Sequence, residues 1–277
     1  MDWFPVERER SRALLIVTTV GSLASTAFLP FVAMLEEQIG VRLAFASLAI
    51  VLLAVTLPLR LALAPMSQPR VGAAEGRPNR ATSGAGARLL GVGLALQSFA
   101  GTGAMLGLIA YLVAMGHALG SAALLTGLAG ASQMIGRFLV GPLQRTVRSP
   151  LRLPAVFLLQ ALALVLVVSG SAPLLVGAVV LFGAAAGAMT LERAAIVIEW
   201  FGARDFGARS GAFATLALLA RAVAPYGVQV LGAAISPRRA LLVLAGVLVL
   251  GAFFAVGGDR MRERGGALSR ADEARPR

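Results

Sequence analysis

The sequence predicts an all-α fold, a polytopic integral membrane helix bundle with about eight transmembrane helices. Hydrophobic residues make up 58% of the 277 residues and charged residues 14%, whereas soluble domains average roughly 45–50% and 25%. Mean hydropathy is +0.83. Apolar runs reach the roughly 20 residues that a helix needs to cross a hydrocarbon core of about 30 Å. We therefore do not expect a water-soluble globular protein.

Eight apolar stretches meet the length criterion for a spanning helix. They are Ala13–Leu35, Leu43–Leu63, Leu89–Met115, Ser121–Gln144, Leu153–Ser169, Pro173–Glu199, Gly207–Ile235 and Ala240–Gly257. The fifth and sixth are separated at Ser169–Pro173, a turn-forming segment inside an uncharged run that is too long for one span. The first is longer than the apolar region of a signal peptide, about 7–15 residues, so we expect it to be retained.

These stretches divide the chain into four predicted parts. Residues 1–63 hold two helices, and residues 64–87, rich in Pro, Gly, Arg and Ser, form a flexible cytoplasmic linker. Residues 88–258 hold six helices. Residues 259–277 are charged and form a disordered cytoplasmic tail.

The arginines predict the orientation. All 25 basic residues are arginines; most fall in connections on the side of the two termini, while Arg42, Arg238 and Arg239 fall on the other side. Cytoplasmic loops are enriched in Arg and Lys, so both termini are predicted to be cytoplasmic, in the plasma (inner) membrane. The net charge of +12 then reflects topology and contact with anionic lipid. Nucleic acid is not an expected partner, because the arginines form no patches.

The residue content excludes several kinds of chemistry. The chain has no cysteine and a single histidine, His117, in a predicted external loop. Disulfides, thiolate metal sites and thiol catalysis are thus excluded, and no metal or other cofactor is expected. The glycines include no phosphate-binding loop followed by a lysine, and no HExxH or serine-centred motif is present. The chain is therefore not expected to be an enzyme, although an integral-membrane enzyme is kept as the least favoured alternative.

Charged residues inside the predicted helices are the first candidates for a functional site, because a central charge costs roughly 2.5–3.5 kcal/mol. Arg137 ranks first. It shares one helical face with small and polar residues, namely Thr126, Gly130, Gln133, Gly141 and Gln144. This face is predicted to line a polar path in which the guanidinium binds a carboxylate. The alternative is that Arg137 reaches the cytoplasmic interface or pairs with a neighbour.

Four more charges accompany Arg137. Arg221 lies near mid-membrane and either binds the solute or forms a buried ion pair with Glu192 or Glu199. Glu192 is a candidate proton-titrating group if burial raises its pKa. The favoured interpretation is that Glu192, Arg193 and Glu199 form structural pairs and interface anchors near the cytoplasmic end.

Uncharged residues complete the candidate set. Gln97 and Tyr111 are candidate pathway residues on the third stretch. Gly183 and Gly187 have the small-x3-small spacing that lets membrane helices approach closely. Pro30 and Pro225 are candidate kink or gating positions.

An internal repeat relates the first and seventh stretches. The first copy contains Trp3-Phe4, Arg10-Ser11-Arg12-Ala13, Pro30 and Arg42; the second contains Trp200-Phe201, Arg209-Ser210-Gly211-Ala212, Pro225 and Arg238. Six predicted helices separate the copies, which is typical of parallel repeats in transporters. If the repeating unit has six helices, four helices are missing before the first stretch.

Residues 182–232 combine a Gly-rich helix, the Trp200-Phe201-Gly202 loop, Gly207, Gly211 and a late Ala224-Pro225 pair. This stretch resembles the tenth and eleventh helices of the major facilitator superfamily, whose members have twelve helices in two halves. The resemblance implies that the chain holds the last two helices of the first half and all of the second. The segment Gly141–Arg145 resembles that family's gating motif, with Gln144 where an aspartate is usual, so Gly141 and Arg145 become candidate gating residues.

Arg137, followed four residues later by Gly141, resembles the eighth helix of monocarboxylate porters. The resemblance implies a carboxylate-binding role for Arg137. In those porters an aspartate one turn earlier supports proton coupling, and that position is Gln133 here. The resemblance therefore favours an organic-anion site more than proton symport.

The leading hypothesis is a secondary active transporter that moves a small anionic organic solute across the lipid bilayer by alternating access. The coupling ion, H+ or Na+, is left open. The alternative is a truncated, non-transporting membrane scaffold or fragment. A homodimer is expected if the chain truly has eight helices.

Overall fold

The computed structural model describes residues 84–170 and 172–273, residues 42–59, and single positions or short pieces between 31 and 62. The chain divides into two units, Met1–Arg77 and Pro78–Arg277, and this division falls within the segment that the sequence predicts as a linker. All regular elements among the described residues are helices. The chain is an all-α integral membrane protein, as predicted.

Seven described helices are long and apolar enough to cross a membrane. They are Arg42–Leu59, Ala85–Ala114, Leu119–Pro142, Ser149–Ser169, Leu174–Gly202, Gly207–Ile235 and Pro237–Gly265. Each matches one of the predicted stretches from the second to the eighth. The first stretch, Ala13–Leu35, lies outside the described residues apart from Phe31 and Leu35.

The first unit contributes the span Arg42–Leu59. Its large apolar side chains, such as Phe45, Leu52 and Leu57, are more than half exposed. A helix that is apolar on all sides and exposed is suited to lipid or to other membrane helices.

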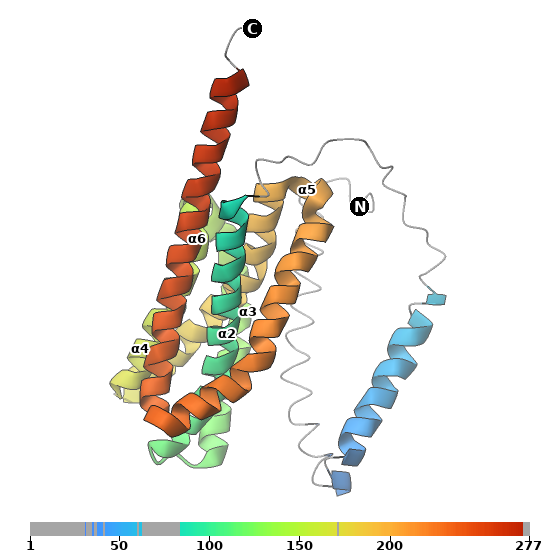
Figure 1. Ribbon diagram of the computed structural model, residues 1–277. Coiled ribbons are helices and arrows are strands. Elements are labelled where there is room, and N and C mark those ends of the chain that lie inside the picture. The colour runs from blue at the N-terminus through green and yellow to red at the C-terminus, as the bar shows by residue number, and fades with distance from the viewer. Residues whose placement is uncertain are drawn as a thin grey trace. The chain divides into compact units, whose positions relative to one another are not determined.

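The second unit is a bundle of five helical elements, α2 (Ala85–Ala114), α3 (Leu119–Thr146), α4 (Ser149–Ser169), α5 (Ala172–Ile235) and α6 (Pro237–Glu273) (Figure 1). α5 holds two spans. Its backbone breaks at Gly202, where φ is 75° and ψ is 166°, a region that is essentially accessible only to glycine. The chain turns back there, so the first half of α5 (Leu174–Gly202) and its second half (Gly207–Ile235) cross the bundle in opposite directions.

Glycines allow the helices of this bundle to pack closely. On α2 and α6, Gly86 faces Gly258 and Gly93 faces Gly251, a heptad apart on each helix. On α5, Gly183 and Gly187 lie against the backbone carbonyls of Ala129 and Gln133 on α3. The second pair has the small-x3-small spacing that indicates close approach. The pairing of α2 with α6 is a contact that the sequence analysis did not predict.

Two of the predicted boundaries need correction. The segment from Asp259 is predicted to be a disordered tail, but α6 continues as helix to Glu273. Contacts hold the helical turn that begins at Asp259: Arg262 pairs with Asp259 at 3.9 Å, and its guanidinium lies over the ring of Trp200, 5.2 Å from the ring centroid. The predicted linker reaches residue 87, whereas α2 already begins at Ala85, because Gly86 packs against α6.

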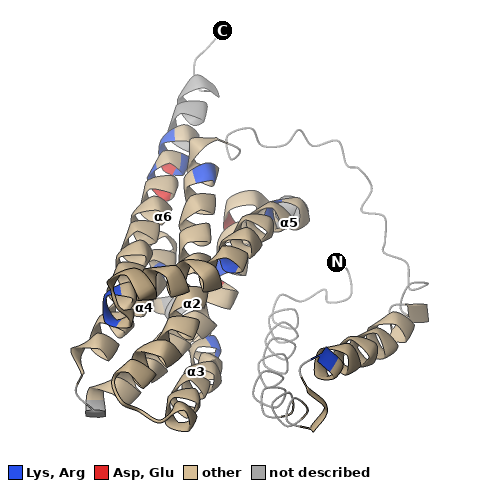
Figure 2. Cartoon of the chain, turned by 60° about the horizontal axis from the view of Figure 1, so that its bottom comes forward, with Lys and Arg blue, Asp and Glu red and all other residues tan. Residues whose placement is uncertain are grey.

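Charge is distributed as expected for helices in a membrane. Figure 2 shows long uncharged stretches along the bundle, with acidic residues on the C-terminal part of α6. The apolar core includes Phe157, Phe182 and Leu244, each at most 2% exposed. Polar groups buried at mid-bundle therefore stand out against an apolar background, and several of them share one cavity.

Candidate functional site

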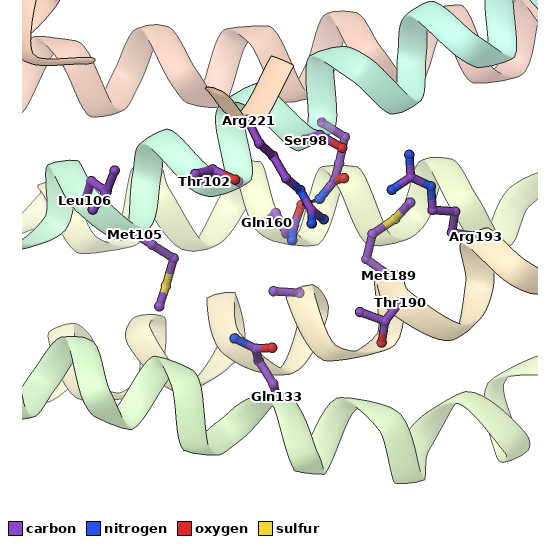
Figure 3. Close-up of a pocket in the computed structure, with 13 residues that line it drawn as sticks. Ser98, Thr102, Met105, Leu106, Gln133, Gln160, Met189, Thr190, Arg193 and Arg221 are labelled. Carbon is purple, nitrogen blue, oxygen red and sulfur yellow. Dashed lines mark hydrogen bonds between the residues drawn. The ribbon is translucent and has the colours of Figure 1, made fainter. Parts of the chain in front are cut away.

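A partly open cavity of about 420 Å³ lies between α2, α3, α4 and both halves of α5. Its walls carry two arginines, three glutamines, a serine and two threonines among apolar side chains (Figure 3). The lining residues are Gln97, Ser98, Gly101, Thr102, Met105, Leu106, Gln133, Gln160, Ala186, Met189, Thr190, Arg193 and Arg221. Four of the residues predicted from sequence, namely Gln97, Gln133, Arg193 and Arg221, are thus brought together.

The two arginines reach the cavity from the two halves of α5. Arg221 extends from the second half toward Gln160 of α4, and Arg193 lies at one end of the cavity (Figure 3). The Arg193 guanidinium donates a hydrogen bond from Nη2 to the carbonyl oxygen of Phe213, at 3.1 Å. This bond spans the break in α5 and fixes the guanidinium beside the cavity. No carboxylate lines the cavity among the residues the structure describes, so its charge is positive.

Two amides and a hydroxyl, from Gln97, Gln160 and Ser98, form a polar part of the cavity wall. Gln97 Nε2 on α2 donates a hydrogen bond to Gln160 Oε1 on α4, at 3.1 Å. Gln160 is fully buried, and its Nε2 finds no hydrogen-bond acceptor among the described groups. The same holds for Ser98 Oγ, whose side chain is 2% exposed. An unsatisfied buried polar group costs about 1–3 kcal/mol. Both groups line the cavity, so an acceptor bound there would remove this cost.

The glutamates of α5 do not line the cavity. They lie at the end of the bundle where α3 is joined to α4. Glu192 is 2% exposed; Arg152 of α4 lies 3.8 Å from it, and Gln144 of α3 donates to it at 3.2 Å. Glu199 pairs with Arg152 at 3.0 Å and Arg262 at 3.9 Å, and it accepts a hydrogen bond from Ser149. We call this set (Gln144, Ser149, Arg152, Glu192, Glu199, Asp259 and Arg262) the charge cluster.

The charge cluster decides between the two hypotheses for Arg221. A buried ion pair of Arg221 with Glu192 or Glu199 is not found among the ion pairs of the described side chains. Arg152 and Arg262 pair with these glutamates instead. The pairing that the sequence allowed for Arg221 is therefore wrong, and its guanidinium lies on the cavity. The structural pairing predicted for Glu192 and Glu199 is correct, with partners from α4 and α6. Arg193, the third residue of that prediction, bonds instead to the carbonyl oxygen of Phe213.

Three predicted pathway residues do not line the cavity, namely Glu192, which belongs to the charge cluster, Arg137 and Tyr111. Arg137 is 8% exposed and lies one helical turn beyond Gln133, outside the cavity lining. Tyr111 is 2% exposed and donates a hydrogen bond to the carbonyl oxygen of Val167 at 3.3 Å. It ties α2 to α4 within the apolar core. The carboxylate-binding role of Arg137 stays a prediction.

The predicted gating and packing residues are dispersed. Gly183 and Gly187 lie in the contact of α5 with α3. Gly141 has open space around it. Pro225 lies within the second half of α5, on the wall of another cavity. Pro30 and the side chain of Arg145 lie outside the described part of the chain.

Sequence reasoning missed Gln160, Ser98, Thr102 and Thr190. Gln160 had a clear signal, because it is the one strongly polar side chain in the predicted stretch Leu153–Ser169. Polar residues within a spanning helix mark functional sites by the same logic that singled out the arginines. The serine and threonines carried no comparable signal, since hydroxyls bond readily to the backbone of their own helix.

No protein-family model matches the chain, and no curated protein matches it. Guanidinium groups bind carboxylates through paired, charge-assisted hydrogen bonds. Buried amide N–H and hydroxyl groups add neutral donors to the same space. The cavity is thus equipped to bind a small organic anion in the interior of a membrane helix bundle.

Proposed function

We propose that this protein is a secondary active transporter for a small anionic organic solute, working by alternating access. We further propose that it lies in the plasma (inner) membrane with both termini cytoplasmic and is related to the monocarboxylate porters of the major facilitator superfamily. The observation that supports the proposal most is the mid-bundle cavity. It combines Arg193, Arg221 and the unsatisfied Gln160 Nε2, with no carboxylate among its described lining residues.

The energetics of a membrane interior favour this interpretation. A charged arginine at mid-membrane is unfavourable by roughly 2.5–3.5 kcal/mol on insertion scales. Arg221 is predicted to lie near mid-membrane, and its charge and that of Arg193 repel each other across one cavity. A bound anion compensates for both effects. Charged residues within spanning segments are candidates for solute pathways by default.

The arrangement of helices is also suited to alternating access. The cavity is built from α2, α3, α4 and both halves of α5, and solutes of repeat-built transporters bind at mid-membrane between helices of this kind. The charge cluster connects α3, α4, α5 and α6 at one end of the bundle. Helices linked in this way can move together relative to the rest of the transporter.

The experiment that tests the function measures flux in proteoliposomes. The full chain is reconstituted, and uptake of radiolabelled acetate, lactate, benzoate and succinate is followed with and without H+ and Na+ gradients. We expect uptake of at least one carboxylate well above that of empty liposomes. Absence of flux for all four anions under every gradient would favour the non-transporting scaffold.

A matched pair of variants ties flux to the cavity. Arg221→Gln removes a cavity charge, whereas Arg238→Gln removes the same charge from an exposed position at the start of α6. Hydrogen bonds to charged groups contribute about 1.5–3 kcal/mol. The first variant should therefore bind and transport roughly 10- to 150-fold less well, and the second should match the unmodified chain. Equal flux in both variants would remove the cavity from the pathway.

A further inference from the structure

A second, partly open cavity, of about 810 Å³, lies between α2, the start of α3, the second half of α5 and the start of α6, and several of its lining side chains, such as Val113 and Leu119, are exposed. Its walls are apolar and include Leu106, Ile109, Val113, Pro225 and Val228. Gln229 is the one strongly polar side chain in the described lining. This cavity is larger than the cationic one and differs from it in chemistry.

The two cavities adjoin. Leu106 lines both of them. On α2 their lining residues follow one another from Gln97 to Ala114. On α5, Arg221 of the first cavity is followed at steps of four, three and four residues by Pro225, Val228 and Gly232 of the second. This spacing places them along one helical face.

The polarity changes in one direction along this path. Figure 3 shows Arg193 at one end of the first cavity, Arg221 beside Gln160 in the middle, and Leu106 with Met105 at the other end. Beyond Leu106 the walls are almost wholly apolar. From Arg221 to Gly232 the path extends about 16 Å, at about 1.5 Å per residue along the helix. A ligand that fits both parts carries an anion at one end and an aliphatic chain at the other.

We propose that the solute is an amphipathic monocarboxylate of medium chain length. Its carboxylate lies with Arg193 and Arg221, and its alkyl chain passes Leu106 into the apolar cavity. This inference rests on the proposed anion transport and specifies the substrate class. Each methylene moved from water into an apolar cavity strengthens binding by about fourfold. A short anion leaves this contribution unused, so the paired cavities select for chain length.

The test measures binding of acetate, butyrate, hexanoate and octanoate to the full chain in nanodiscs of zwitterionic lipid. We expect affinity to rise by up to about fourfold for each added methylene. Gly232→Phe is the informative variant: a Cβ atom on Gly232 meets nothing within 4 Å, so the ring can enter the cavity. It should weaken octanoate binding at least tenfold and leave acetate binding within twofold. Ala110→Phe obstructs the same cavity from α2 and provides a second variant if the first does not fold.

Gly246→Phe is the matched control. Gly246 lies exposed on α6, has open space around its Cβ position, and lines neither cavity. The octanoate affinity of Gly246→Phe should equal that of the unmodified protein. A loss seen in Gly232→Phe but not in Gly246→Phe then reports binding in the cavity and not partition into lipid.

The outcomes separate this inference from the proposed function. If all four carboxylates bind with equal affinity, the proposed place of the alkyl chain in the apolar cavity is overturned, while anion binding stands. If none binds, both fail. Equal binding of octylammonium and octanoate would overturn the role of the arginines. Displacement of octanoate by phosphatidylglycerol would assign the apolar cavity to membrane lipid and overturn the proposal.

Discussion

Gly93 on α2 and Gly251 on α6 lie so close that a Cβ atom on Gly93 would be 2.8 Å from the carbonyl oxygen of Gly251. One heptad away, Gly86 and Gly258 have the same relationship, also at 2.8 Å. Membrane helices associate without a hydrophobic driving force, so close backbone contact of this kind contributes much of their packing energy. The contact fixes α2, which carries one wall of the cationic cavity.

Substitution of Gly93 should therefore loosen the bundle. Gly93→Val places its added atoms against backbone, which cannot move aside as a flexible side chain does. Overpacking of this kind costs about 1–3 kcal/mol. We expect a lower midpoint of thermal unfolding in detergent. Gly246→Val, on the exposed face of α6, is the control and should unfold near the midpoint of the unmodified chain. A similar midpoint for both variants would contradict close packing of α2 on α6.

The charge cluster predicts a second effect. Glu192 is 2% exposed and Arg152 is 11% exposed, and Arg152 is the arginine that pairs with Glu192. Arg152→Gln leaves the buried carboxylate without its cation, which costs about 3–5 kcal/mol in comparable pairs. The double variant Arg152→Gln with Glu192→Gln removes both charges and should recover much of this loss. Denaturation in detergent measures the difference.

Arg262 provides the comparison within the same cluster. Its side chain is 32% exposed and its partner Glu199 is 35% exposed, so solvent screens the pair. Exposed pairs contribute about 0–1 kcal/mol. Arg262→Gln should therefore destabilise the protein less than Arg152→Gln. If Arg262→Gln destabilised the protein more than Arg152→Gln, the exposed pair of Arg262 with Glu199 would be the main stabilising contact of the charge cluster.

The amide pair in the cavity predicts that stability and binding can be separated. Gln160→Leu leaves Gln97 Nε2 without its acceptor and should cost about 1–3 kcal/mol. Changing both glutamines to leucine removes the orphaned group and should restore the unfolding midpoint. Octanoate affinity should fall in Gln160→Leu, because the amide donor at that position is lost. It should remain low in the double variant, although the stability recovers. Recovery of affinity together with stability would show that the amides serve the fold alone.

Much of the fold could be predicted from sequence because length and hydropathy are local properties. Every described span lies where an apolar stretch predicts it, and Gly202 breaks α5 at the predicted connection. The boundaries at Ala85 and Asp259 were wrong because contacts between distant helices extend α2 and α6 beyond their apolar residues.

The site could be predicted only in part. Charge within an apolar helix was enough to single out Arg193 and Arg221, both of which line the cavity. Helical spacing placed Gln133 and Arg137 on one face, but it could not show that the cavity ends between them. The choice of Arg152 as partner for Glu192 depends on how α4 packs against α5. A single sequence does not contain that packing in any local pattern.

The break at Gly202 explains how Arg193 and Arg221 come to line one cavity. In an unbroken helix, Arg193 and Arg221 would be about 42 Å apart, at about 1.5 Å per residue, farther than the thickness of the hydrocarbon core. Reversal of the chain at a single glycine brings both onto one cavity. The two arginines of the proposed anion site thus belong to one continuous helical hairpin, and any change in the angle at Gly202 would alter the spacing of the two positive charges.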